Sequence, residues 1–132
     1  MVIVSRKCVQ VLIGALIGLG LPLVAMAQTA TVLTSAQIVE IFAGKTIKQV
    51  DDQYWAFFEP TGRLGGLYVN DEDEGRWGFA EDQICQQWSE WNANKTLCFY
   101  VLEGIEGAYR FDNGEGSGFN VVVRDGNPMD LL

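Results

Sequence analysis

The stretch WGFAEDQICQQWSEWNANKTLCFYV, residues 77–101, decides the fold. It holds three of the four tryptophans and two of the three cysteines of the chain. If Cys85 and Cys98 face each other across a hairpin, the strands on either side of a turn at Trp91-Asn92 share a core face made of Ile84, Trp88, Leu97, Phe99 and Val101. The opposite, mixed face carries Gln83, Cys85, Gln87, Thr96, Cys98 and Tyr100. A slip of one residue would bury the glutamines, so the apolar alternation and a disulfide favour the same register.

Short apolar segments separated by turn residues continue on both sides of this hairpin. We expect strands at residues 46–50, 53–59, 64–70, 76–80, 83–90, 96–103, 107–111 and 119–124, with an acidic turn at 71–75. Seven or eight strands at about ten-residue spacing, without helices between them, are typical of an antiparallel meander. Closure of the meander into a small barrel, or its strong coiling, would remove the unpaired edges. The sequence therefore predicts a mainly β fold.

One helix is expected before the strands. Thr34-Ser35-Ala36-Gln37 is a capping-box pattern, and Ile38, Ile41 and Phe42 follow at the spacing of one apolar helix face. Gly44 suits the left-handed residue that ends a helix. So short a helix is not stable alone in water and must pack on the sheet. Residues 28–33, ahead of it, are expected to form a mobile lead.

The first 27 residues have the features of a secretory signal peptide. Arg6 and Lys7 precede an apolar run, and Ala25-Met26-Ala27 is a small-x-small cleavage pattern. A membrane anchor is the alternative, since the run approaches the roughly 18 residues that span a bilayer. Its glycines and the polar residues from Gln28 onward favour cleavage after Ala27. We expect a periplasmic or secreted protein, without membrane association, whose residues 28–132 form a single β-rich domain.

Charge and cysteine content narrow the function further. All 17 acidic residues follow Ala27, with only seven of the nine basic ones, so residues 28–132 carry a net charge of −10. Such a charge repels phosphate backbones and anionic lipids, which excludes nucleic acid as a partner. Cys85 and Cys98 are the only cysteines after the signal segment, and an even pair in an exported protein favours a disulfide. We expect no metal site and no cofactor, because two cysteines without histidine make a poor zinc site.

Several functions remain open from the residues alone. The dense aromatic residues could line a cavity for a small apolar ligand, with Trp55, Tyr68, Trp77 and Tyr100 as candidate contacts, but narrow barrels are often filled by their own side chains. The acidic surface could instead dock a basic protein partner, as an inhibitor of a cationic cell-envelope protein would. The acidic residues 71–74 and the glycine-rich residues 112–118 have calcium-like composition without a spaced ligand pattern. An enzyme is disfavoured: the chain has no histidine, and only a hydrolase that uses paired carboxylates could operate.

The order of these features resembles a known group of proteins. The segments are Gly44-Lys45-Thr46, Pro60 to Arg63, Gly75 to Gly78, Ile84-Cys85 with Trp88, Cys98, and Gly126-Asn127. Together they look like short exported proteobacterial proteins classed as a domain of unknown function. The resemblance covers most of residues 28–132 and implies a periplasmic location. It assigns no activity and no catalytic residue.

Overall fold

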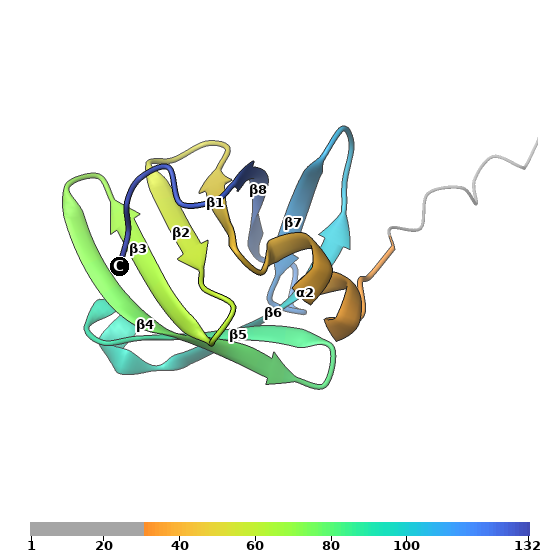
Figure 1. Cartoon of the computed structure of the whole chain (residues 1–132). Helices are drawn as coiled ribbons and strands as arrows, with labels where there is room; N and C mark the ends of the chain where they lie inside the picture. Colours follow the sequence, from red (N-terminus) through yellow and green to blue (C-terminus); the bar gives the residue numbers. More distant parts are fainter. Residues whose placement is uncertain (1–30) are drawn as a thin grey trace, which may run out of the picture. The chain divides into compact units, whose positions relative to one another are not determined.

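A computed structural model describes residues 31–132 and shows an eight-stranded antiparallel barrel (Figure 1). Consecutive strands pair in order, and pairing of the first with the last closes the barrel. The elements are α2 (Ser35–Phe42), β1 (Lys45–Gln49), β2 (Tyr54–Phe58), β3 (Arg63–Tyr68), β4 (Asp71–Ala80), β5 (Gln83–Trp88), the 3₁₀ helix η3 (Trp91–Asn94), β6 (Thr96–Glu103), β7 (Ala108–Asp112) and β8 (Gly118–Asp125). The predicted mainly β meander with one helix is confirmed. The predicted signal segment lies outside the described residues.

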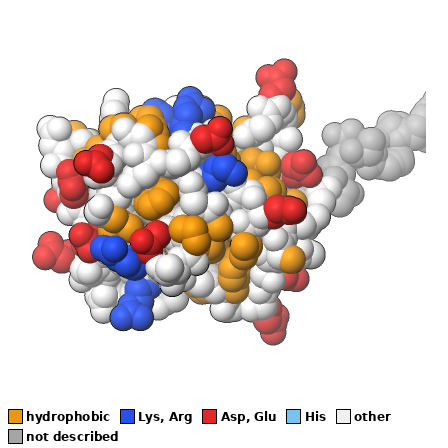
Figure 2. Space-filling view, viewed as in Figure 1, with side chains coloured by type: hydrophobic (Ala, Val, Ile, Leu, Met, Phe, Trp, Pro, Cys, Tyr) orange, Lys and Arg blue, Asp and Glu red, His pale blue; other side chains and the backbone are white. Residues whose placement is uncertain are grey.

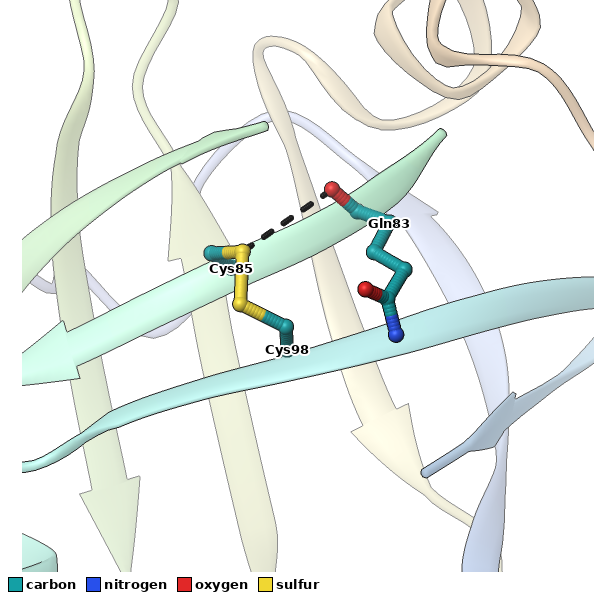
Figure 3. The surroundings of a disulfide bond; sticks show 3 residues. All are labelled: Gln83, Cys85 and Cys98. Carbon is teal, nitrogen blue, oxygen red and sulfur yellow. Dashed lines mark hydrogen bonds between the residues drawn. A yellow bond between two sulfur atoms is a disulfide. The ribbon is translucent and has the colours of Figure 1, made fainter. Parts of the chain in front are cut away.

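The hairpin of β5 and β6 has the register expected from the sequence. Cys85 pairs directly with Cys98, and Ile84 with Phe99. The two cysteines form a disulfide on the outer face of the barrel, with Cα atoms 4.0 Å apart (Figure 3). In Figure 3 a dashed line marks the 3.9 Å approach of Cys85 Sγ to the Gln83 carbonyl oxygen. The disulfide thus joins two neighbouring strands that already pair through their backbones.

The acidic segment 71–75 is not a turn, contrary to the sequence prediction. It forms the first half of β4, paired with β3 from Tyr68↔Asp71 to Leu64↔Gly75. The turn is shorter and lies at Val69-Asn70, where Val69 takes a positive φ of 61°. Strand geometry alternates the four acidic side chains between the two faces of the sheet. Asp71 and Asp73 therefore share one face, and this decides the role of both in the site.

Helix α2 packs against the end of the barrel where β2 finishes. Thr34 caps the helix: its side chain accepts from the Gln37 backbone N–H, and the Thr34 N–H donates to Gln37 Oε1 over 2.9 Å. Ile38 and Phe42 are fully buried. The Phe42 ring lies 5.9 Å from Phe58 and 5.7 Å from Phe111, between centroids. This end of the barrel is filled by its own side chains.

The segment before the helix is not a free lead, which corrects the prediction for residues 31–33. Val32 bridges to Leu102, and the Leu33 N–H donates to the Val101 carbonyl over 2.8 Å. Leu33 is only 3% exposed. β5 pairs with β6 only as far as Ile84↔Phe99, so the end of β6 leaves room for another extended segment. Residues 31–33 occupy that room and hold the helix close to the barrel.

Candidate functional site

The end of the barrel away from α2 is open and forms a pocket. Tyr54 begins β2 and lines this pocket, whereas Phe58 ends β2 and packs against the helix. The pocket has a volume of about 550 Å³, within the usual range of small-molecule sites. Its walls come from most of the strands and from η3: Gln49, Asp52, Tyr54, Tyr68, Asp71, Gln86, Trp88, Trp91, Asn92, Leu97, Phe99 and Phe119.

Aromatic rings form most of the wall. The Tyr54 ring lies 6.3 Å from Trp88, 6.3 Å from Trp91 and 6.1 Å from Phe119, between centroids. The contacts with Trp88 and Phe119 are edge-to-face, with interplanar angles of 78° and 89°. These are preferred geometries for aromatic pairs. The rings therefore support one another and leave apolar faces toward the pocket.

Trp91 is held over the pocket by both carboxylates of the inward face of β4. Asp71 Oδ2 accepts from the Trp91 indole Nε1 over 2.7 Å. Asp73 Oδ2 accepts from the backbone N–H groups of Trp91 (2.9 Å) and Glu90 (2.8 Å), and Asp73 Oδ1 accepts from Glu74 (2.8 Å). Partial burial opposes ionisation of Asp73, but these three backbone hydrogen bonds lower its pKa below the usual value. The acidic run thus fixes the loop that carries Trp91.

Gly66 makes room for the two tryptophans of the pocket. A Cβ atom on Gly66 would lie 2.5 Å from the Trp88 ring and 2.7 Å from the Trp91 ring. The two rings lie 4.7 Å apart between centroids, at 49°. Any side chain at position 66 would displace them.

The loop that presents Trp91 is conformationally strained. Asn92, Ala93 and Asn94 all have positive φ, at 57°, 55° and 62°. Asparagine tolerates this region, but alanine adopts it at a cost of about 1–2 kcal/mol. Non-glycine residues in such conformations cluster at ligand clamps and active sites. Asn92, the first of these three residues, is one of the wall residues of the pocket, while other non-glycine residues with positive φ, such as Glu81 and Glu106, are not wall residues.

Gln86 is the buried polar group of the pocket. Its side chain is on the inward face of β5 between Ile84 and Trp88, and the residue is only 3% exposed. Gln86 Oε1 accepts from the Tyr54 hydroxyl over 3.4 Å, while Gln86 Nε2 has no hydrogen-bond partner among the described residues. Burial raises the pKa of the Tyr54 phenol well above its usual value, so this hydroxyl remains protonated. A buried donor without a partner is uncommon and costly.

The structure brings only one of the four predicted ligand contacts to this pocket. Tyr68 lies at its mouth and is 45% exposed. Trp77 packs against Phe58 in the core and donates its indole N–H to the Glu59 carbonyl over 2.8 Å. Trp55 is on the outside of the barrel, where Lys48 Nζ lies 5.6 Å from its ring. Tyr100 is also on the outside, in the register of the disulfide face, and is 40% exposed.

The sequence interpretation missed Gln86 and Trp91 as pocket residues. Gln86 alternates with Ile84 and Trp88, so the register already placed its amide on the core face. A glutamine between two core positions was the available signal. Trp91 was assigned to the turn, and nothing local indicates that the turn folds back over the barrel mouth through contacts with β4.

The wall is mostly aromatic. Its polar side-chain groups include three amides, two carboxylates and the hydroxyls of Tyr54 and Tyr68. Within residues 31–132 there is no group of three or more His, Cys, Asp or Glu side chains placed to hold a metal ion. In the loop at residues 112–118, Asp112 instead accepts from Arg110 Nε (3.3 Å) and from the Gly114 N–H (2.8 Å). No helix in this part of the chain is long and apolar enough to cross a membrane.

Comparison with protein-family models, with curated proteins and with solved structures finds no significant match. The function must therefore be inferred from the site itself.

Proposed function

We propose that this chain is an exported, non-enzymatic binding protein that holds a small aromatic or apolar molecule in the open end of its barrel. The single observation that carries the proposal is the pocket of about 550 Å³ with the unpaired amide of Gln86 in its wall. A pocket that is mostly apolar, with few polar groups in fixed positions, is the usual form of a small-molecule site.

The construction of the pocket supports this proposal. The α2 end of the same barrel is filled by Phe42, Phe58 and Phe111, so the chain has side chains large enough to fill such a space. At the other end, a loop with positive φ values and the hydrogen bonds of Asp71 and Asp73 hold Trp91 in the wall of an open pocket. Strain and a buried unpaired donor both lower stability. A binding role explains why they occur together at one place.

Docking of a basic protein on the acidic surface has less support. Figure 2 shows carboxylate side chains scattered over the visible face, with Lys and Arg side chains between them. Arg63, for example, lies 3.9 Å from Glu59 and 3.6 Å from Glu74. A docking surface that acts by electrostatic steering is expected to present one sign of charge over a continuous patch.

A pocket-filling variant tests the proposal. Leu97 lines the pocket, whereas its neighbour Thr96 points outward and is exposed. We expect an uncharged two-ring aromatic amide to bind the wild-type protein saturably in isothermal titration calorimetry, with little dependence on salt. Leu97→Trp should abolish this binding, and the matched control Thr96→Trp should retain it. Equal binding by both variants, or no binding of any compound in a broad aromatic panel, would refute the proposal.

Export is part of the same proposal. It rests on the signal-like residues 1–27, which lie outside the described residues, and on the disulfide between Cys85 and Cys98. Disulfides persist in oxidising compartments such as the periplasm.

A further inference from the structure

We infer that the ligand is a flat aromatic cation that enters with a hydrogen-bond acceptor leading, so that the acceptor meets Gln86 Nε2 and the positive charge remains between Asp52 and Asp71 at the mouth. This inference rests on the proposed binding function and names the chemistry that the pocket selects. Two separate features of the wall carry it, one at the inner end of the pocket and one at its rim.

The inner feature is the orientation of the Gln86 amide. Its oxygen is engaged by the Tyr54 hydroxyl, at 3.4 Å, which leaves the two N–H groups of Nε2 as donors. Tyr54 cannot serve as a charged acceptor, because burial raises its phenol pKa well above neutral. The surrounding wall is made of the apolar rings of Trp88, Phe99 and Phe119. An acceptor on the edge of a flat ligand, such as a ring nitrogen or a carbonyl, would satisfy the donor.

The rim feature is the sign of the charge. Among the described residues that line the pocket, Asp52 and Asp71 are the only charged ones. Each uses one carboxylate oxygen in the fold: Asp52 Oδ1 accepts from the Gln53 N–H, and Asp71 Oδ2 accepts from Trp91 Nε1. Among the described residues, neither carboxylate forms an ion pair.

Lys48 is not among the residues that line the pocket. Lys48 Nζ donates to the backbone carbonyls of Gln49 (3.1 Å) and Asp52 (3.2 Å), and it lies over Trp55 on the outside of the barrel. The aromatic rings around the mouth, Tyr68 and Trp91, also favour a cation through their negative faces. At the mouth, Asp52 and Asp71 would repel an anionic ligand such as a fatty acid or an aromatic carboxylate.

Four matched probes separate these two features. Three are quinolines that carry an aminomethyl, carboxamide or carboxylate group on the ring remote from the nitrogen; they are the amine, amide and carboxylate probes. The fourth is the aminomethyl naphthalene of the same shape, which lacks the ring nitrogen. Near neutral pH the quinoline nitrogen is an unprotonated acceptor, so the amine probe and the naphthalene differ only in the group offered to Gln86.

Calorimetric titration of the full chain with each probe gives the first result. We expect the amine probe to bind about tenfold more tightly than the carboxylate probe in low salt, with the amide probe between them, and the difference to shrink as salt rises. We expect the amine probe to bind about three- to tenfold more tightly than the naphthalene. In Gln86→Leu that second preference should vanish. In Asp71→Asn, which keeps an acceptor for Trp91, the preference for the amine over the amide should fall.

The four probes distinguish failure of the proposed function from failure of this inference. If none of the four probes binds, both the proposed function and this inference are wrong. If the probes bind without regard to charge, or the carboxylate probe binds as tightly as the amine probe, the pocket binds ligands but the cation assignment is wrong. If the naphthalene binds as tightly as the amine probe, Gln86 Nε2 does not donate a hydrogen bond to the ligand, and the acceptor assignment is wrong.

Discussion

A change that removes the buried polar pair in the pocket should stabilise the protein. Gln86 is only 3% exposed, and its Nε2 lacks a partner among the described residues. Leaving such a donor unpaired costs about 1–3 kcal/mol. Among the described residues, the Gln86 side chain has one hydrogen bond, from the Tyr54 hydroxyl. It is 3.4 Å long, against a usual 2.7–2.8 Å, so it contributes at the low end, about 0.5 kcal/mol. The cost of the unpaired donor exceeds the gain from this weak hydrogen bond. Replacement of both the Gln86 amide and the Tyr54 hydroxyl by apolar groups should therefore stabilise the fold.

The double variant Tyr54→Phe with Gln86→Leu tests this balance. We expect its free energy of unfolding to exceed that of the wild type by about 1–2 kcal/mol, since no polar group is left without a partner. The melting temperature should rise by about 4–8 °C for each kcal/mol in a domain of this size. Urea denaturation with the disulfide intact measures the free energy, and an unchanged slope against urea shows that the folded and unfolded states are otherwise alike.

Gln87 is the matched control, one residue further along the same strand. It lies on the exposed face of β5 and donates from Nε2 to the Asn94 carbonyl over 3.1 Å. Gln87→Leu should therefore destabilise the protein by about 0.5–1 kcal/mol, the net value of a hydrogen bond. Opposite signs at two adjacent glutamines are the expected result. A double variant that is less stable than the wild type would show that Gln86 is satisfied in the unliganded protein, and the reasoning would fail.

The other predictions concern the disulfide, the strained loop, the acidic strand and the signal segment. Replacement of Cys85 and Cys98 by alanine, a pair 13 residues apart, should lower the free energy of unfolding by about 3 kcal/mol in the chain-entropy model; a loss below 1 kcal/mol in denaturant titration would contradict it. Ala93→Gly should raise stability by about 1 kcal/mol, because Ala93 has a φ of 55°; a loss would show that the left-handed loop is absent in solution. Asp73→Asn should cost about 1–2 kcal/mol at neutral pH, because both carboxylate oxygens accept backbone N–H bonds and asparagine keeps only one of these acceptors. The pKa of Asp73 is lower in the folded than in the unfolded state. The difference in free energy of unfolding between the wild type and Asp73→Asn should therefore be constant above the unfolded pKa, near 3.8, and shrink as pH falls through the folded pKa. A difference that persists in strong acid would argue against the three backbone hydrogen bonds. Bacterial expression of the full chain should yield a periplasmic protein whose N-terminus is Gln28, and retention of residues 1–27 in mass spectrometry would exclude cleavage.

The strand pattern was predictable because it depends on alternation within single segments. The register of β5 and β6 followed from Cys85, Cys98 and the apolar residues between them, and the structure has that register. The helix cap at Thr34 is also local in sequence. The acidic segment was misassigned because four carboxylates suggest a solvated turn, whereas two of them, Asp71 and Asp73, bind a loop nearly twenty residues away.

The pocket was harder to predict, because it depends on contacts between distant strands. The predicted register already placed Tyr100 on the face opposite the core, whereas alternation placed Trp55 only relative to its own strand. Both lie outside the barrel. Closure of the barrel was allowed by the sequence, but nothing local shows which end a helix fills. Trp91 is held at the pocket by hydrogen bonds from its backbone and indole N–H groups to Asp73 and Asp71. The strands could therefore be predicted from local sequence patterns, whereas the pocket depends on contacts between residues far apart in the sequence.

The indole N–H signals of the four tryptophans test the central claim most directly. Trp88 and Trp91 line the pocket, while Trp55 and Trp77 lie elsewhere. In heteronuclear NMR spectra assigned with Trp→Phe variants, titration with the amide probe should shift the Trp88 and Trp91 signals saturably. The Trp55 and Trp77 signals should remain nearly unchanged. Shifts confined to Trp55 and Trp77, or no saturable shift at Trp91, would contradict the assignment of the barrel mouth as the binding site.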